Sequence, residues 1–327
     1  MTWPKSLSKK IEPTRALARG FLGEMPKRSK LIRALKGAIF WPQGIRTKVN
    51  LAGYTSFKIG GQAKYFFEPK NPKSLQQALV AAQQAGLRVF ILGAGSNILV
   101  SQAGLDGLVI RLSSQNFRKC RCQGSCVVAG SGLKLNALIS FLKKKNLCGL
   151  EFLVGIPGTL GGSLVGNAGA WGKAIGESVK QVGVLDYNGK LRRLKNKQLK
   201  FIYRKSNLNK YIIIWAKLKL QAAQKKIIAA KINHYLLRRK QFLSPSLPNA
   251  GCIFKNPVCG SAGRLIAACG LKGKSRGGAA ISKLHANFIL NTGNAKSDDV
   301  LLLMDLIQKK VKERFKINLV PEIKIWK

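Results

Sequence analysis

The sequence predicts an α+β protein built from two or three domains. The chain has 327 residues, whereas one domain takes roughly 100–200 residues. Helix-like and strand-like patterns are mixed along it, and residues from about 230 to the end look like a separate α+β unit. A hydrophobic content of 46% with a charged content of 21% is typical of a globular chain with a sizeable core.

The expected elements follow from the spacing of apolar residues. Residues 1–27 are basic and are expected to form an extension, and residues 29–39 have the spacing of a short helix. We then expect strands over 54–61, 63–67, 88–92 and 108–112, and a helix over 74–85. Further along we expect strands over 182–187 and 211–220 and helices over 135–145 and 227–239. A last helix over 298–315 is expected to have Ser297 as its N-cap.

The charge is strongly one-sided, with 58 Lys and Arg against 12 Asp and Glu, a formal net charge of +46. Such a balance favours anionic partners. The basic residues are spread through every segment and interleaved with core runs, and aromatic residues make up only 8%. We therefore favour a general bias or steering of anionic substrates over a specific nucleic-acid site.

The sequence predicts neither a membrane span nor a secretion signal. A spanning helix needs about 18 or more consecutive apolar residues, and no such run exists. The most apolar region, residues 152–172, is broken by Pro157 and many glycines, so we expect loops and turns there. The N-terminus lacks an apolar signal core, which makes the cytoplasm the expected location.

Seven cysteines form no framework typical of secreted domains. Cys120, Cys122 and Cys126 lie close together, but the chain has only two histidines and no second ligand pair at zinc-like spacing. We expect reduced thiols in a pair of strands and no metal site.

Two glycine-rich stretches dominate the possible chemistry. The first, LGAGSN at 92–97, follows a short apolar strand, and its backbone N–H groups could bind phosphate oxygens. It is not a dinucleotide fingerprint, because Ile98 stands at the third glycine position. The second, GIPGTLGGSLVGNAGAWG at 155–172, has seven glycines and almost no charge. It suggests backbone packed against a large flat ligand, or else a buried glycine-packed crossing.

Eight motifs in a fixed order give the chain a specific resemblance. They are YTSFKIGG, LGAGSN, the glycine-rich stretch, YRKS at 203–206, NAGCIFKNP at 249–257, AGRLIAACGLKG at 262–273, HANFILN at 285–291 and LVPEI at 319–323. From about residue 45 to the end, the chain resembles the UDP-N-acetylenolpyruvoylglucosamine reductase (UDP-N-acetylmuramate dehydrogenase) family.

The resemblance implies a fold and an activity. The fold would be a two-part FAD-binding module of the flavin-linked oxidase (PCMH) type over residues 46–225, split near 113. A substrate-binding α+β domain over 226–327 would follow it, and residues 1–45 would be an extension. The activity would be the NADPH-dependent reduction of UDP-N-acetylglucosamine enolpyruvate to UDP-N-acetylmuramate in peptidoglycan precursor synthesis. We expect a cytoplasmic monomer with no specific nucleic-acid partner.

The resemblance also implies cofactor and substrate contacts. The expected FAD contacts are Gly93, Gly95, Ser96, Asn97, Ile156, Gly158, Gly161, Gly162, Ser163, Asn167 and Gly169. Lys240, Asn256 and His285 match positions near the diphosphate and sugar of the substrate, although His285 could equally be a packed histidine.

Three residues are expected to be catalytic. Arg204 and Glu322 match the family arginine and glutamate that stabilise the enolate-like intermediate, and Cys252 stands where relatives commonly have the proton-donating serine. A thiol, with a pKa of about 8.5, is a stronger acid than a hydroxyl and could donate this proton. We therefore expect an active, thiol-sensitive enzyme.

Three alternatives stay open from the sequence. The first is another flavin-linked oxidase, which the motifs at 249–257 and 319–323 disfavour. The other two are a degenerate paralogue and a basic nucleic-acid-binding protein that retains the fold.

Overall fold

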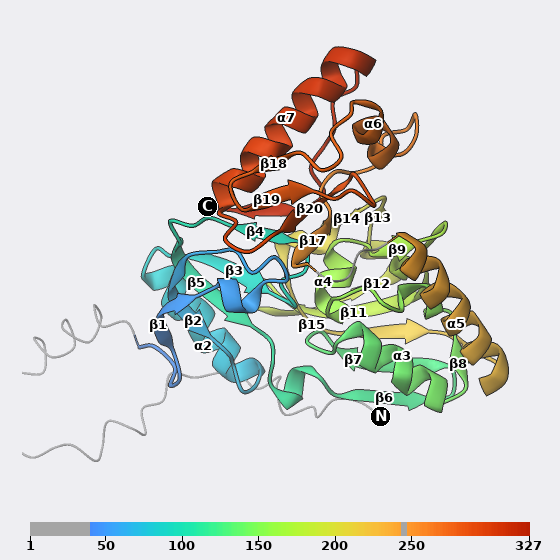
Figure 1. Ribbon diagram of the computed structural model, residues 1–327. Helices are drawn as coiled ribbons and strands as arrows, with labels where there is room; N and C mark the ends of the chain where they lie inside the picture. Colours follow the sequence, from blue (N-terminus) through green and yellow to red (C-terminus); the bar gives the residue numbers. More distant parts are fainter. Residues whose placement is uncertain (1–39, 243–246) are drawn as a thin grey trace, which may run out of the picture. The chain divides into compact units, whose positions relative to one another are not determined.

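The structure is a computed structural model that describes residues 40–242 and 247–327. The expected extension at 1–27 and helix at 29–39 lie outside the described residues. Residues 41–327 form one compact unit, in which three sheets and their helices are joined (Figure 1). Within the described part, every helix is too short or too polar to cross a membrane.

The first subdomain is a four-stranded sheet in the order β1–β2–β5–β3. Its elements are β1 (Arg46–Asn50), β2 (Gln62–Phe67), α2 (Pro72–Gln84), β3 (Arg88–Leu92) and β5 (Leu105–Arg111). β1 runs antiparallel to β2, and the other two pairs are parallel. The helix α2 begins at Pro72, two residues before the expected start, because Asn71 accepts a hydrogen bond from the Ser74 N–H and Pro72 opens the first turn. The strands expected at 63–67, 88–92 and 108–112 are confirmed within a few residues.

The strand expected over 54–61 is wrong. This segment follows the short 3-10 helix η3 (Ala52–Tyr54) as a turn, and the Ser56 N–H donates to the carbonyl of Gly95 at 3.0 Å. Its apolar spacing has another cause, since Phe57 and Ile59 are fully buried in the core of the C-terminal domain. Burial between domains therefore produced the pattern that suggested a strand.

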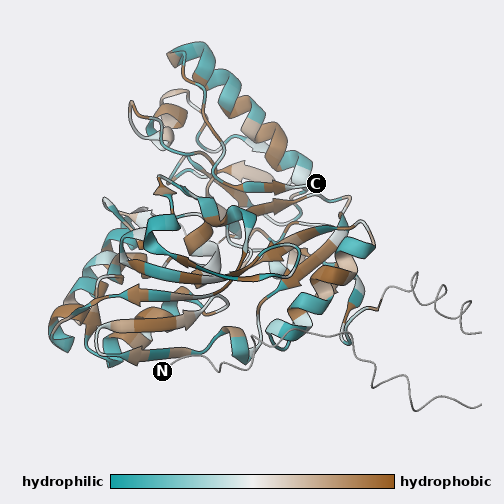
Figure 2. Ribbon diagram, turned by 180° about the vertical axis from the view of Figure 1, so that it is seen from behind, coloured by the Kyte–Doolittle hydropathy of each residue, from teal (hydrophilic) through white to brown (hydrophobic). Residues whose placement is uncertain are grey.

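The second subdomain is a five-stranded antiparallel sheet in the order β12–β11–β15–β7–β6. Its strands are β6 (Cys120–Gln123), β7 (Cys126–Gly130), β11 (Val179–Leu185), β12 (Leu191–Lys195) and β15 (Ile212–Lys219). The helices α3 (Leu135–Lys144), α4 (Leu160–Val165) and α5 (Lys225–Phe242) pack against its core. Figure 2 shows hydrophobic colour concentrated on the strands, whereas the long helices carry both colours.

Cys120, Cys122 and Cys126 lie in the paired strands β6 and β7, as expected. Cys126 pairs with Gln123, so it faces the opposite side of the sheet from Cys120 and Cys122. Burial raises the pKa of the Cys120 thiol to about 12, and the neighbouring Cys122 adds to the shift. Cys120 and Cys122 are half-buried and pack against the core, whereas Cys126 lies on the other face of the sheet.

Short hairpins and turns shape the region between these strands. β9 (Gly169–Ala170) pairs with β10 (Lys173–Ala174), β13 (Phe201–Ile202) with β14 (Lys205–Ser206), and β8 (Leu147–Cys148) with β16 (Gln221–Ala222). The remaining 3-10 helices are η4 (Gln115–Phe117), η5 (Glu151–Leu153), η6 (Ile175–Ser178), η7 (Asn196–Gln198) and η8 (Asn207–Lys210). The apolar glycine-rich stretch thus contains the expected turns, together with the short helix α4 and the β9–β10 hairpin, which the sequence analysis did not predict.

The third sheet belongs to the C-terminal domain and has the antiparallel order β17–β20–β19–β18. Its elements are β17 (Asn249–Cys252), α6 (Ala262–Ala268), β18 (Ser275–Arg276), β19 (Ala279–Ile281), β20 (Phe288–Asn291) and α7 (Ser297–Phe315). Ser297 is not the N-cap of α7: its hydroxyl accepts from the Gln102 N–H, while the Asp299 carboxylate accepts from the Lys296 N–H at 2.9 Å. The contact with the first subdomain determines this use of Ser297.

The packing departs from the expected boundary at residue 226. The helix α5 packs on α3 and η5 of the second subdomain rather than on the third sheet. The last strand, β21 (Lys324–Trp326), pairs in parallel with β4 (Ile98–Val100) beside the first sheet. The chain therefore returns from the C-terminal domain to the loop that follows β3.

Candidate active site

The two glycine-rich stretches meet. The hydroxyl of Ser96 donates a hydrogen bond to the carbonyl of Pro157 at 2.5 Å. A Cβ at Gly93 would lie 2.8 Å from the Oγ1 of Thr159, and a Cβ at Gly95 would overlap the carbonyl of Tyr54. Gly95 also has a φ of +67°, which glycine adopts without strain. Close backbone approach therefore explains both glycines of LGAGSN.

The backbone at this meeting point fits the diphosphate of FAD. The N–H groups of residues 94–97 donate to no acceptor in the described part of the chain, and the same holds for Gly158 and Thr159. Clustered, unpaired N–H groups form a concave site for anions. FAD carries a diphosphate between its two halves, so the residues present can hold it.

The other expected cofactor residues have different surroundings. Ile156 is half-buried against the core, and Ser163 is buried in α4. Gly158, Gly161 and Gly162 lie along one side of the meeting point, with Gly161 bonded to the carbonyl of Ser131 at 2.8 Å.

Asn167 and Gly169 contact the hairpin that carries Arg204. The Asn167 amide accepts from the Gly176 N–H at 3.1 Å and donates to the carbonyl of Ile202 at 3.0 Å. The carbonyl of Gly169 accepts from the Nη1 of Arg204 at 2.8 Å. Both residues support the hairpin that carries Arg204.

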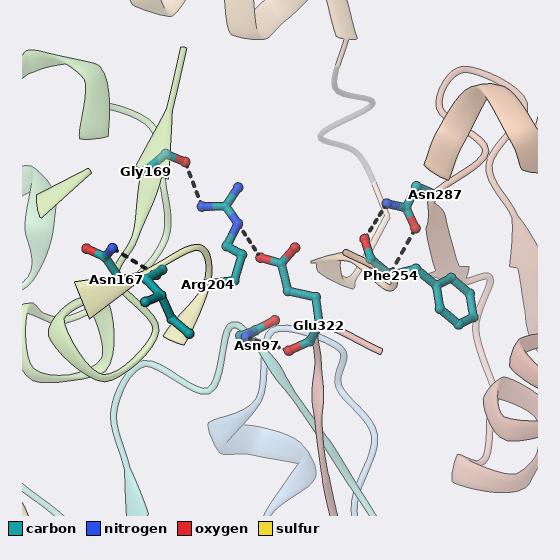
Figure 3. A network of polar contacts seen from close by, with 8 residues as sticks. Asn97, Asn167, Gly169, Arg204, Phe254, Asn287 and Glu322 are labelled. Atoms are coloured by element: carbon teal, nitrogen blue, oxygen red, sulfur yellow. Dashed lines mark hydrogen bonds and ion pairs between the residues drawn. The ribbon is translucent and has the colours of Figure 1, made fainter. Parts of the chain in front are cut away.

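Arg204 and Glu322 form an ion pair at the centre of the site (Figure 3). The Nε of Arg204 lies 2.9 Å from the Oε1 of Glu322, with side chains that are 26% and 17% exposed. Among the described residues no acceptor is aligned with the Nε–H, so the contact is electrostatic. Arg204 sits in the two-residue turn between β13 and β14 with a φ of +54°, a strained value for a non-glycine residue.

Glu322 is held by backbone bonds from two directions. Its N–H donates to the carbonyl of Ile253 at 2.7 Å, and its carbonyl accepts from the side-chain amide of Asn97 at 3.3 Å. Burial raises the pKa of the Glu322 carboxyl, and the positive charges of Arg204 and Lys255 only partly oppose this shift. The LGAGSN loop, which carries the unpaired N–H groups, is therefore bonded directly to Glu322.

Cys252 ends β17 close to this pair. Burial raises the pKa of its thiol to about 12, and the charge of Glu322 adds to the shift. The charge of Arg204 and a hydrogen bond from Asn287 act in the opposite direction. The thiol is thus protonated throughout the neutral range, which suits a proton donor. The sequence predicts thiol sensitivity; the burial of Cys252 instead predicts slow reaction with thiol reagents, because the thiolate is the reactive form.

A small pocket opens beside the ion pair. Its volume is about 140 Å³, and its lining includes Asn97, Lys205, Arg204, Glu322 and Lys324. The three cations in this lining favour an anionic group.

The structure does not bring Lys240, Asn256 and His285 into this group. Lys240 is exposed near the end of α5. Asn256 accepts from the Ala262 N–H at 3.0 Å and so caps α6. His285 accepts from the Asn287 N–H and packs edge-on against Phe288, and burial lowers its pKa. His285 is therefore a packed histidine in this conformation.

Asn287 is a functional candidate that the sequence reasoning missed. Its side chain is buried, accepts from the Phe254 N–H at 2.9 Å and donates to the carbonyl of Phe254 at 2.8 Å (Figure 3). Its own carbonyl accepts from the Ile253 N–H. This clamp fixes the segment that carries Cys252. The HANF motif contained the signal, but only its histidine had been considered.

Arg239 was also missed. It donates to the carbonyls of Val154 and Phe152 and lies 4.7 Å from the ring centre of Trp171. Burial lowers its pKa, and the charge of Arg204 adds to the shift. Arg239 therefore bonds α5 to the segment just before the glycine-rich stretch. The sequence could not single it out, because it is one basic residue among 58.

The unpaired N–H groups of residues 94–97, 158 and 159 form a candidate diphosphate site, called the diphosphate cradle below. Together with the Arg204–Glu322 ion pair and the Cys252 thiol, it indicates a flavin-dependent oxidoreductase. Comparisons with known proteins agree. Residues 63–195 match the FAD binding domain family, and residues 243–326 match the C-terminal domain of UDP-N-acetylenolpyruvoylglucosamine reductase.

Relatives and a solved structure cover most of the chain. The chain is 42% identical over 274 residues to UDP-N-acetylenolpyruvoylglucosamine reductase of Caldanaerobacter subterraneus, covering 83% of this chain and 90% of that protein. It is 40% identical to the enzyme of a Synechococcus species, covering 86% of this chain and 91% of that one. The crystal structure of the enzyme from Thermus caldophilus matches with a TM-score of 0.75 at 33% identity, covering 86% of this chain and all of that one.

The chain belongs to the UDP-N-acetylenolpyruvoylglucosamine reductase family. It is a FAD-containing reductase of peptidoglycan precursor synthesis with NADPH as reductant. The α+β fold with a FAD-binding module and a C-terminal domain is confirmed.

Proposed function

We propose that Arg204, Cys252 and Glu322 carry the second half of the reaction, in which the double bond of UDP-N-acetylglucosamine enolpyruvate is reduced. The observation that supports this most is the ion pair between Arg204 and Glu322, whose charges both act on the Cys252 thiol. Bound FAD supplies the hydride chemistry, accepting a hydride from NADPH and passing it to one carbon of that double bond.

The adjacent carbon then carries negative charge, which spreads into the substrate carboxylate. The guanidinium of Arg204 stabilises this charge with directed N–H donors. The carboxylate of Glu322 lies 2.9 Å from the Nε of Arg204 and holds the guanidinium in place for this contact.

Cys252 completes the reduction. Its S–H bond breaks, the proton bonds to the carbanionic carbon, and the thiolate that remains takes a proton from water. Because the pKa of this thiol is about 12, it enters every cycle protonated. A carbanion next to a carboxylate is a stronger base than a thiolate, so the transfer proceeds towards the product.

Separate measurement of the two half-reactions tests these roles. In Cys252→Ala, NADPH should still reduce the flavin, whereas anaerobic reoxidation by UDP-N-acetylglucosamine enolpyruvate should be largely lost. Cys252→Ser should keep much of the activity. The control is Cys259→Ala, an exposed cysteine seven residues further along that should leave both half-reactions unchanged. Equal loss of both half-reactions in Cys252→Ala would mean that Cys252 is structural.

The expected FAD contacts and the contact of Lys240 with the substrate diphosphate are part of the same proposal. Lys240 is exposed near the end of α5, where a cation can reach a bound nucleotide. Lys240→Ala should raise the KM for the UDP-sugar and leave flavin reduction by NADPH unchanged.

We also propose that the substrate domain begins after α5, and that the protein works as a cytoplasmic monomer. The packing of α5 on the second subdomain supports the revised boundary. All seven cysteines are free thiols, which suits a reducing compartment. Light scattering after size-exclusion chromatography would test the monomer, and a dimer mass would contradict it.

A further inference from the structure

Ser131 carries a buried hydroxyl with no partner in the described part of the chain. It directly follows β7, its residue is only 3% exposed, and its Oγ makes no hydrogen bond there. Its backbone is fixed, since its N–H donates to the carbonyl of Ile214 at 2.9 Å. An unsatisfied buried hydroxyl destabilises a folded protein unless a ligand supplies the partner.

The surroundings of Ser131 are those of the diphosphate cradle. Its carbonyl accepts from the Gly161 N–H, and a Cβ at Gly161 would lie 2.9 Å from the Cβ of Ser131. Two residues before Gly161, the Thr159 N–H is one of the unpaired backbone donors, and the Thr159 side chain approaches Gly93. Because Gly161 has no side chain, its segment approaches the Cβ of Ser131 closely, and the same segment faces the LGAGSN loop.

We propose that Ser131 is a further FAD-binding residue, whose hydroxyl donates a hydrogen bond to an oxygen of the diphosphate–ribityl part of the cofactor. Three features support this ligand: the hydroxyl is buried, it has no hydrogen-bond partner among the described residues, and the Ser131 backbone is bonded to the segment that carries unpaired N–H groups suited to an anion. The hydroxyl adds one neutral donor that a phosphate or ribityl oxygen can use. The inference rests on FAD binding and not on the roles of Arg204, Cys252 or Glu322.

Ser131→Ala removes the hydroxyl with little change in volume, and titration of the apoprotein with FAD measures the effect. Quenching of flavin fluorescence should show affinity weakened about 10-fold, which corresponds to about 1.4 kcal/mol. The melting temperature of the apoprotein should stay the same or rise, because an unsatisfied buried group is removed.

Ser282→Ala is the matched control. Ser282 is also 3% exposed, but its hydroxyl accepts from the N–H groups of Leu284 and His285 in the C-terminal domain. This variant should lower the melting temperature of the apoprotein and leave FAD affinity unchanged.

Two results would overturn the proposal. Unchanged FAD affinity in Ser131→Ala would mean that the hydroxyl bonds a buried water and not FAD. A fall in apoprotein stability as large as that of Ser282→Ala would assign it to a protein partner. If the wild-type apoprotein takes up no FAD, the cofactor assignment itself fails, so the two failures are distinguishable.

Discussion

Replacing Glu322 with glutamine should separate catalysis from stability. The ion pair with Arg204 is short, at 2.9 Å, which alone would suggest a large contribution to folding. The pKa of Glu322 indicates the opposite, because it is raised rather than lowered. The burial penalty on the charged carboxylate therefore exceeds the attraction of Arg204.

The magnitudes follow from this balance. Glu322→Gln removes the burial penalty on the carboxylate but leaves the guanidinium of Arg204 without its counter-charge. The free energy of unfolding at neutral pH should therefore fall by about 1–3 kcal/mol, less than for a fully buried pair because both side chains are partly exposed. Reoxidation of the flavin by substrate should slow by roughly 10²–10³-fold, as for the loss of one preorganised electrostatic group. Flavin reduction by NADPH should keep its rate.

The pH dependence provides a second check. Folded Glu322 keeps its proton to higher pH than the same residue in the unfolded chain. In the window between its ordinary pKa and the raised value, the folded state binds more protons, so wild-type stability falls as pH rises. In urea titrations across this window, the free energy of unfolding of Glu322→Gln should not show this fall with rising pH.

Anaerobic stopped-flow absorbance measures both half-reactions. Glu313→Gln is the control, because Glu313 is exposed and forms its salt bridge with Lys310 on the surface of α7, away from Arg204. It should leave both rates unchanged. Reoxidation of Glu322→Gln at a rate near that of the wild type would refute the argument.

Three other predictions concern the clamp, the thiol and the charge. Asn287→Ala should lower the free energy of unfolding, measured in urea, by about 2–4 kcal/mol, because the buried N–H and carbonyl of Phe254 lose their partners. It should slow substrate reduction more than flavin reduction. Unchanged stability would contradict the clamp. With a pKa of about 12, the Cys252 thiol is about 10⁻⁴ thiolate at pH 8. Iodoacetamide, followed by mass spectrometry, should therefore label Cys252 roughly 10³-fold more slowly than exposed Cys259. Equal labelling would contradict the burial argument. If the net charge of +46 steers anionic substrates, kcat/KM should fall steeply with added salt while kcat changes little. Duplex DNA should not compete with these substrates at physiological ionic strength. Competition there would favour the nucleic-acid alternative.

The sequence determined most elements and the identity of the chemistry. Helices such as α2 and α3 have their own apolar faces and end signals, so local spacing placed them within two residues. The motifs around Arg204, Cys252 and Glu322 carry specific residue types in a specific order, so the resemblance identified the family and suggested roles for these residues.

Only the tertiary structure decided how these residues act on one another. Phe57 and Ile59 have strand-like spacing because they are buried against another domain, and Ser297 bonds Gln102 instead of capping its own helix. The raised pKa values of Cys252 and Glu322 depend on burial by segments that are distant in sequence. The HANF motif contains Asn287 but does not reveal its buried amide clamp, and Ser131 gave no local signal, because a clamp and an unpartnered hydroxyl are both defined by what surrounds them. Spacing along a chain reports which side of an element is apolar, whereas burial, pairing and charge at a site depend on contacts between remote segments.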